Sequence, residues 1–248
     1  METRLTIARN SCKPIALTLS RIVDHKNQVS ENKRLDVINK IYLEISNVIA
    51  RSFVKNEGDI IKSLGEWKQI NAHKIEYNDN NLFLWNINPI ESLDKYLMRD
   101  SSYYTLVSIT KNSDLHASLI YNIRDDVYIS ATKGEGAMIE NEKLRADNSS
   151  SHIFRFICND KLITENLVNI HSYEKHTSNS VIDDIFKLIN GDIDFLIINN
   201  FDLIRYQALT LICKEAKLII DLSKTEGNEW IFLASKARVF NYIVELIR

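Results

Sequence analysis

The chain has 248 residues, of which 45% are hydrophobic, and its 31 basic and 33 acidic side chains give a formal net charge of −2. This length allows one large domain or two smaller ones, with a core that needs no disulfide bridge or structural metal. The near-neutral charge gives no direct nucleic-acid signal, because nucleic-acid-binding domains concentrate positive charge.

The N-terminal segment 1–19 contains no long apolar run. It predicts neither a signal peptide nor a membrane span, so we expect no membrane association and a cytoplasmic location. The three cysteines, Cys12, Cys158 and Cys213, are odd in number and far apart. They predict buried free thiols rather than a disulfide framework or a zinc site.

Two long amphipathic helices are expected over residues 11–25 and 35–53, because apolar residues recur there at helical spacing. The polar segment 25–33 should join them. Residues 81–90 have a strand-like pattern that ends at Pro89.

A short helix should begin near Ser92, and a run of strands should follow it. These strands are expected at Tyr103–Thr110, Leu115–Asn122 and Val127–Thr132. Residues 111–114 form a plausible hairpin turn, and turns are also expected at 133–137 and 141–143.

The polar stretch 147–151 predicts a boundary between an N-terminal lobe, 1–147, and a C-terminal lobe, 148–248. The first lobe would contain the two helices and an antiparallel sheet. In the second, short strands alternate with helices, which indicates an α/β lobe. The strands are expected at 153–158, 193–198, 218–221 and 230–234, and the helices near 178–190, 203–215 and 237–247.

The segment WNINPIESL, residues 85–93, resembles the W-x-x-D-P-[IL]-D-G-T signature of the inositol monophosphatase family. The Trp, the Pro and the Ile of the signature are kept. Its two aspartates, which bind Mg²⁺ in that family, are replaced by Asn88 and Glu91. The Gly-Thr that follows is replaced by Ser92 and Leu93.

Other segments resemble further motifs of the family, in the same order along residues 33–247. They are Ser108-Ile109-Thr110 for the end of a strand, 133–141 for the G-x-G-A-x-x-N turn, 191–194 for G-x-x-D, 215–216 for the E-A corner and 229–234 for a late strand. The resemblance is strongest to the SuhB-like (extragenic suppressor protein) branch. It implies a layered αβαβα sandwich of the α/β (α+β) class and a homodimer.

In the family, carboxylates hold Mg²⁺ ions that polarise the phosphate and activate water. Leu64-Gly65-Glu66-Trp67 resembles the I-G-E-E metal loop, so Glu66 would be the acidic ligand that is kept; Glu76 is a weaker alternative. Asn88 keeps the shape of Asp without its charge. Glu91 keeps the charge but is one methylene longer, and Mg²⁺ demands near-ideal octahedral geometry.

Arg205 stands where the family has the third metal-binding aspartate. An ungapped count from Asp194 and one back from Glu215 both reach it, whereas Asp202 would need a three-residue slip. The resemblance thus implies a remnant of the metal site at Glu66, Asn88, Ile90, Glu91 and Arg205. Arg205 could neutralise the remaining carboxylates in place of a metal.

The water-activating and substrate positions also differ from the family. Leu93 replaces the threonine that positions water, and the partner carboxylate should fall near Tyr42 or Leu43, neither of which is a base. Ile198 replaces the acidic residue that contacts inositol hydroxyls. Asn179-Ser180 stands in place of the Gly-Ser that lines the substrate site.

These replacements favour a non-catalytic protein that acts through protein contacts or binds a phosphorylated ligand, with no cofactor. The backbone at Ser92 and Leu93 could join Arg205 in binding an anion. The SuhB-like resemblance implies partners in RNA processing and transcription. The alternative is a Mg²⁺-dependent phosphomonoesterase with an altered site, whose metal would use Glu66 and Glu91.

Overall fold

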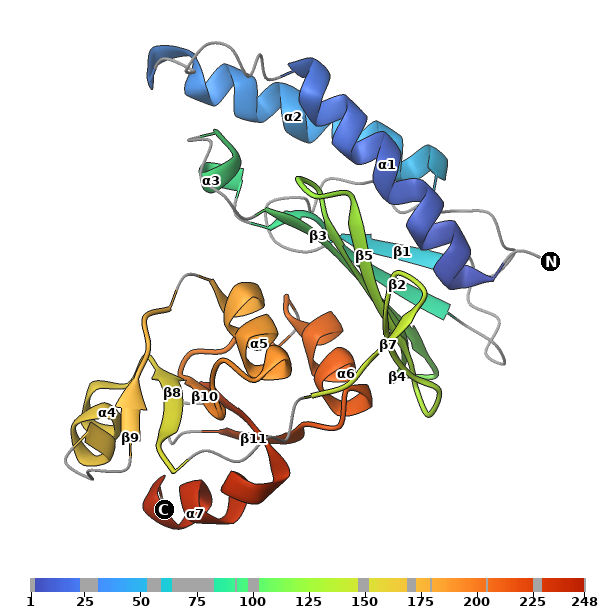
Figure 1. Ribbon diagram of the computed structural model, residues 1–248. Helices are drawn as coiled ribbons and strands as arrows, with labels where there is room; N and C mark the ends of the chain where they lie inside the picture. Colours follow the sequence, from blue (N-terminus) through green and yellow to red (C-terminus); the bar gives the residue numbers. More distant parts are fainter. Residues whose placement is uncertain are drawn as a thin grey trace. The chain divides into compact units, whose positions relative to one another are not determined.

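The computed structural model describes residues 3–22, 31–52, 59–63, 83–91, 93–97, 103–146, 152–168, 173–178, 180–203, 205–224 and 229–247. The chain forms two compact units, residues 1–133 and 134–248, which are coloured along the sequence in Figure 1. The predicted lobe boundary at 147/148 lies outside the described residues.

Two helices pack against each other in the first unit, α1 (Arg4–Ile22) and α2 (Glu31–Ser52). Helix α1 buries one face, whose residues are Ile7, Ala8, Ser11, Cys12, Ile15 and Leu19. The spacing of three and four residues is that of an amphipathic helix. The predicted pair of helices is therefore confirmed, although α1 begins before residue 11 and continues through Pro14.

The described residues of the first unit include five strands, which are neighbours in the sheet in the order of the chain. They are β1 (Asp59–Ser63), β2 (Phe83–Glu91), β3 (Tyr104–Lys111), β4 (Asp114–Asn122) and β5 (Val127–Thr132). Strand β1 is parallel to β2, and the later pairs are antiparallel. The short helix α3 (Leu93–Leu97) follows β2. Apolar residues of β2, β3 and β4 form one core with α1 and α2.

The second unit contains the hairpin β6 (Gly136–Ile139) and β7 (Glu142–Leu144), together with a five-stranded sheet. The order of this sheet is β11-β12-β10-β8-β9, with β8 (Phe154–Cys158), β9 (Tyr173–Lys175), β10 (Phe195–Ile198), β11 (Ile219–Lys224) and β12 (Trp230–Ser235). Strand β8 is parallel to both β9 and β10, whereas β12 is antiparallel to β10 and β11.

Helices cover both faces of this second sheet (Figure 1). They are α4 (Lys161–Val168), α5 (Val181–Asn190), α6 (Gln207–Glu215) and α7 (Ala237–Ile247). Val239 and Ile243 of α7 pack with Phe195 and Ile197 of β10, and Leu167 of α4 joins the same cluster. Helices α5 and α6 lie on the opposite face. The predicted α/β alternation is confirmed, but β1, β6, β7, α4 and β9 were not predicted; β6 and β7 begin within the segments 133–137 and 141–143, where turns were expected.

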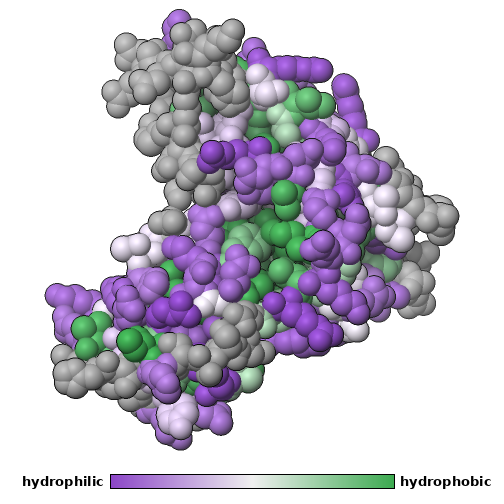
Figure 2. Space-filling model, in the orientation of Figure 1, coloured by the Kyte–Doolittle hydropathy of each residue, from purple (hydrophilic) through white to green (hydrophobic). Residues whose placement is uncertain are grey.

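The three cysteines are buried free thiols, as predicted. Burial raises the pKa of Cys213 to about 12, so this thiol is protonated at neutral pH. Among the described helices, none is both long and apolar enough to cross a bilayer. Figure 2 shows the molecule in the orientation of Figure 1. On the side that faces the viewer, hydrophilic residues cover most of the coloured surface, with hydrophobic residues in smaller patches between them.

Candidate functional site

Strand β2 ends in an irregular segment that carries two of the predicted site residues. Its pairing with β3 shifts register between Asn88 and Glu91. Pro89 lies between them and has no N–H to donate to a neighbouring strand. Its carbonyl accepts a hydrogen bond of 2.8 Å from Thr105 Oγ1. A regular strand would place positions 88 and 91 on opposite faces, but the irregularity brings their side chains to the same side.

Asn88 and Glu91 are joined by a short side-chain hydrogen bond. Asn88 Nδ2 donates to Glu91 Oε2 at 2.6 Å, and the two residues are only 6% and 5% exposed. An amide oxygen at this distance would repel the carboxylate, so the NH₂ group must face it. Hydrogen bonds to an ionised acceptor are short and strong. The buried carboxylate of Glu91 therefore has a donor from within its own strand.

Apolar side chains at and after the end of β2 pack in the core of the first unit. Ile90 is 3% exposed within the core of the first unit, and Leu93 at the start of α3 packs against the same core. Tyr96 of α3 meets Tyr103 edge to face, with ring centroids 4.7 Å apart. Ser92 lies outside the described residues, so the predicted anion contact of the backbone at 92–93 stays a prediction.

The position predicted for the water-activating carboxylate falls on α2. Tyr42 is partly buried against the core, whereas the Leu43 side chain is 64% exposed. Neither side chain can accept a proton from water at neutral pH. The next residue, Glu44, is exposed.

In the second unit, Ser180 and Ile198 lie on regular elements. Ser180 is the N-cap of α5, where its Oγ accepts a hydrogen bond of 3.1 Å from the Asp183 amide and donates one of 2.6 Å to Asp183 Oδ2. This side chain is used in capping the helix. Ile198 ends β10 and is 8% exposed. An apolar residue there gives a ligand hydroxyl no hydrogen-bond partner.

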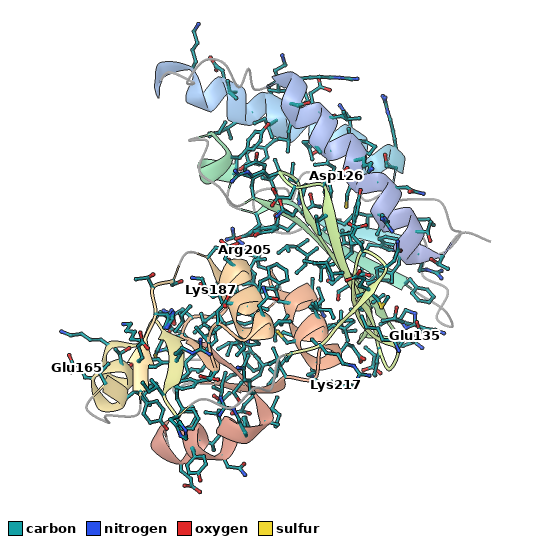
Figure 3. The ribbon with its side chains drawn as sticks, viewed as in Figure 1. Asp126, Glu135, Glu165, Lys187, Arg205 and Lys217 are labelled. Atoms are coloured by element: carbon teal, nitrogen blue, oxygen red, sulfur yellow. The ribbon has the colours of Figure 1, made fainter. Side chains whose placement is uncertain are left out.

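Arg205 lies in the segment between β10 and α6, where Figure 3 labels it, and it is exposed. Its backbone N–H donates to Asp202 Oδ1 at 2.9 Å, and its guanidinium carbon lies 5.6 Å from the centre of the Tyr206 ring. The Asp202 side chain thus fixes the turn before α6. The predicted ion pair of Arg205 with Glu66 or Glu91 stays a prediction.

Solved structures with the same architecture are inositol monophosphatases. The enzyme from Anabaena (Nostoc) matches with a TM-score of 0.70 at 14% identity, over 98% of this chain and 94% of that one. The enzyme from Zymomonas mobilis matches with a TM-score of 0.72 at 10% identity, over 97% and 95%. Mycobacterium tuberculosis SuhB matches with a TM-score of 0.65 at 12% identity, over 97% and 92%.

The chain has the inositol monophosphatase fold. The predicted layered α/β fold class is therefore confirmed. No family model and no curated protein sequence matches the chain.

Within this fold, the described residues place Asn88, Ile90 and Glu91 together at the end of β2. Glu66, its alternative Glu76, and Asn179 lie outside the described residues, so their predicted roles stay predictions. In the part of the chain that the structure describes, no group of three or more His, Cys, Asp or Glu side chains is arranged to hold a metal ion.

The structure joins two segments that the sequence matched to separate motifs of the inositol monophosphatases. Glu215 accepts hydrogen bonds from the Gly134 amide at 2.8 Å and from the Gly136 amide at 3.0 Å, one on each carboxylate oxygen. Both glycines have positive φ, +82° and +100°, which residues with a Cβ rarely adopt. The E-A corner therefore fixes the turn before β6.

Sequence reasoning missed a buried charge cluster around Asp194. Lys236 Nζ lies 3.0 Å and Arg238 Nη2 lies 2.7 Å from Asp194 Oδ1, and the Arg155 amide donates to Oδ2 at 2.9 Å. Burial alone would raise the pKa of Asp194, but the Arg155 amide and the two cations outweigh it and hold this pKa below its usual 3.8. The only sequence signal for this cluster was the basic pair Lys236 and Arg238. The first lies just before the last predicted helix and the second lies inside it.

Proposed function

We propose that this protein is a non-catalytic relative of the inositol monophosphatases that acts through protein contacts or by binding a phosphorylated ligand. The observation that carries the proposal is the hydrogen bond from Asn88 Nδ2 to Glu91 Oε2. Two carboxylates at these positions would repel each other and need a cation between them. The amide removes that need.

The Asn88–Glu91 pair is a poor fit to a magnesium site. Mg²⁺ takes oxygen ligands in a near-ideal octahedron. Asn88 points its NH₂ group, which cannot bind a metal, at the carboxylate; to share a metal ion with Glu91 Oε2 through its own oxygen, the amide must turn over and lose the hydrogen bond. Arg205 is always protonated and can bind an anion, but it cannot lower the pKa of a bound water as a metal does.

The partners belong to the same proposal. The SuhB-like resemblance favours contacts with proteins of the transcription or RNA-processing machinery, in the cytoplasm, by a homodimer. Arg205 is an exposed guanidinium and favours a phosphorylated small molecule as the alternative ligand.

A magnesium titration tests the proposal at the residues that carry it. We expect MgCl₂ at about 10 mM, well above the range of weak hard-cation sites, to give no saturable heat and no rise in Tm for the wild-type protein. The matched comparison is the double variant Asn88→Asp with Glu91→Asp, which restores the two aspartates of the family signature and should gain a Tm response to Mg²⁺. A saturable Mg²⁺ site in the wild type that Glu91→Gln removes would instead support the altered phosphomonoesterase.

A further inference from the structure

A pocket of about 380 Å³ lies beside α1 in the first unit. Small-molecule sites typically have volumes of roughly 300–1,000 Å³, so this pocket has room for a compact ring system. Its lining comes from α1, from α3 and the residue before β3, and from the end of β4 with the turn that follows. Among the lining residues are Lys13, Leu17, Tyr96, Tyr103, Tyr121 and Asp126.

The pocket has a buried floor and a rim that solvent reaches. Tyr96 and Tyr121 form the floor, where they are 2% and 3% exposed and belong to the core of the first unit. Leu17 at the rim is 57% exposed, and the side chains of Lys13 and Asp126 are 58% and 59% exposed. A ligand can therefore enter from water and contact ordered core side chains.

Three tyrosine rings make the interior of the pocket aromatic. Tyr96 and Tyr103 meet edge to face, with their ring planes at 81°. Tyr121 stacks on Tyr128, with ring centroids 4.6 Å apart. Aromatic rings prefer stacked or edge-to-face neighbours of their own kind. Because the rings of the pocket are already held in place, a planar aromatic ligand contacts them without first having to order them.

Helix α1 contributes an apolar wall next to its buried face. Ala16 and Leu17 line the pocket together with Lys13 and Ser20, and this spacing of three and four residues places the four on one stripe of the helix. An aromatic ligand against Leu17 removes apolar surface of both partners from water, which favours binding.

The charges at the rim are arranged in pairs of opposite sign. Lys13 Nζ lies 3.4 Å from Asp126 Oδ2, and Arg124 Nε lies 4.0 Å from Asp125 Oδ1. A charged ligand at this rim would therefore meet a like charge beside every opposite one, and like charges side by side are unfavourable. An uncharged ligand leaves both pairs in place.

Asp126, which Figure 3 labels, is a fixed hydrogen-bond acceptor at the rim. The Tyr121 hydroxyl donates to Asp126 Oδ1 at 3.0 Å, and Lys13 lies beside Oδ2. Burial raises the pKa of Tyr121, so its hydroxyl stays protonated as the donor at neutral pH. A carboxylate has about four acceptor positions. Asp126 can therefore accept one more N–H or O–H from a ligand.

We propose that this pocket binds an uncharged aromatic molecule with an N–H or O–H donor, its ring against Tyr96 and Tyr103 and its donor on Asp126. The tyrosines favour a planar ring, the paired charges favour a neutral molecule, and the carboxylate favours a donor on its edge. The site is independent of the proposed function, because it uses neither Arg205 nor the end of β2.

The test is calorimetric titration of the full chain with indole, an uncharged planar aromatic molecule that has one N–H. We expect saturable binding with a Kd on the order of 1 mM or tighter. 1-Methylindole lacks the N–H and should bind at least about fivefold more weakly. Indole-3-acetate and tryptamine, which carry a negative and a positive charge, should each bind more weakly than indole.

Variants of the pocket locate the binding. Tyr103→Leu removes a ring but keeps an apolar side chain, and Leu17→Ala removes apolar surface; each should weaken indole binding at least about threefold. Leu43→Ala is the matched control, because Leu43 is a 64% exposed leucine of α2 that does not line the pocket. It should bind indole within about twofold of the wild type.

Asp126→Gly tests the proposed hydrogen bond. Asp126 has a φ of +54°, which glycine adopts readily, so the variant should keep the turn. Indole and 1-methylindole should bind this variant equally, because the acceptor that distinguishes them is gone. In NMR spectra of the wild type, the amide resonances of Ile123 and Asp126 should shift and saturate with added indole, which locates the site even if a variant unfolds.

The proposal is overturned if indole shows no saturable binding up to about 5 mM, or if Tyr103→Leu and Leu17→Ala bind it as tightly as the wild type does. It is also overturned if the wild type binds 1-methylindole as tightly as indole, or if Asp126→Gly still prefers indole. Tighter binding of indole-3-acetate or tryptamine than of indole would likewise contradict it, since the pocket would then select a charged ligand.

Discussion

The side-chain amide of Asn88 donates to the carboxylate of Glu91 at 2.6 Å, within one irregular strand end where the sequence resemblance places two metal-binding aspartates. The pair keeps one negative charge and supplies its own donor. A carboxylate that is buried at 5% exposure is costly unless it is hydrogen-bonded or paired. The Asn at position 88 therefore gives this segment a way to fold that does not depend on a bound cation.

We expect Asn88→Asp to destabilise the protein by about 2–3 kcal/mol at neutral pH, because it removes a charge-assisted hydrogen bond and places a second carboxylate beside Glu91. Urea unfolding at pH 7 measures this, with Asn141→Asp, at an exposed turn position, as the control. A variant as stable as the wild type would show that the Asn88 amide contributes little to the fold.

Asp194→Asn should cost about 3–5 kcal/mol at pH 7, because it strands buried cations. The pKa of Asp194 is lowered in the folded protein, so its contribution to stability is present above the usual value of 3.8 and is lost as the pH falls through the lower folded pKa. The difference in unfolding free energy between the variant and the wild type should therefore shrink below about pH 4.

The control for that comparison is Asp192→Asn, an exposed carboxylate two positions earlier, which should change stability little at any pH. If the difference between Asp194→Asn and the wild type were constant from neutral to acid pH, Asp194 would not be the titrating group.

Periodicity predicted the elements that bury one regular face. Strand β5 (Val127–Thr132) and helix α7 (Ala237–Ile247) have the bounds that the apolar pattern gave. Strand β1 (Asp59–Ser63) was not predicted, because its five residues do not alternate regularly between apolar and polar and so show no clear strand period. Its pairing with β2 is parallel, and no turn signal marks a parallel pair.

The candidate site was predictable only as a set of positions. The resemblance found Asn88 and Glu91, but their hydrogen bond depends on a register shift that alternation alone would not predict. The sequence did not predict that Asp194 would contact Arg155 and Lys236, because these residues come from separate elements that only the tertiary fold brings together.

A second buried carboxylate offers an independent prediction about the first unit. Asp59 is 1% exposed, and it accepts hydrogen bonds from the Arg4 guanidinium at 2.9 Å and from Trp85 Nε1 at 3.0 Å. We expect Asp59→Asn to cost about 3–5 kcal/mol, because the charge that holds Arg4 against β1 is lost. Denaturant unfolding measures it, with the exposed Asp36→Asn as the control; equal stability of the two variants would refute the role of Asp59.

The most direct test of the central claim is the release of phosphate from inositol 1-phosphate by the purified wild-type protein, with Mg²⁺ and then with a chelator. Without metal activation, the protein should lose several kcal/mol of transition-state stabilisation, so we expect no chelator-sensitive turnover. Turnover above roughly 1 s⁻¹, the low end of typical enzymes, that requires Mg²⁺ and disappears in Glu91→Gln would contradict it.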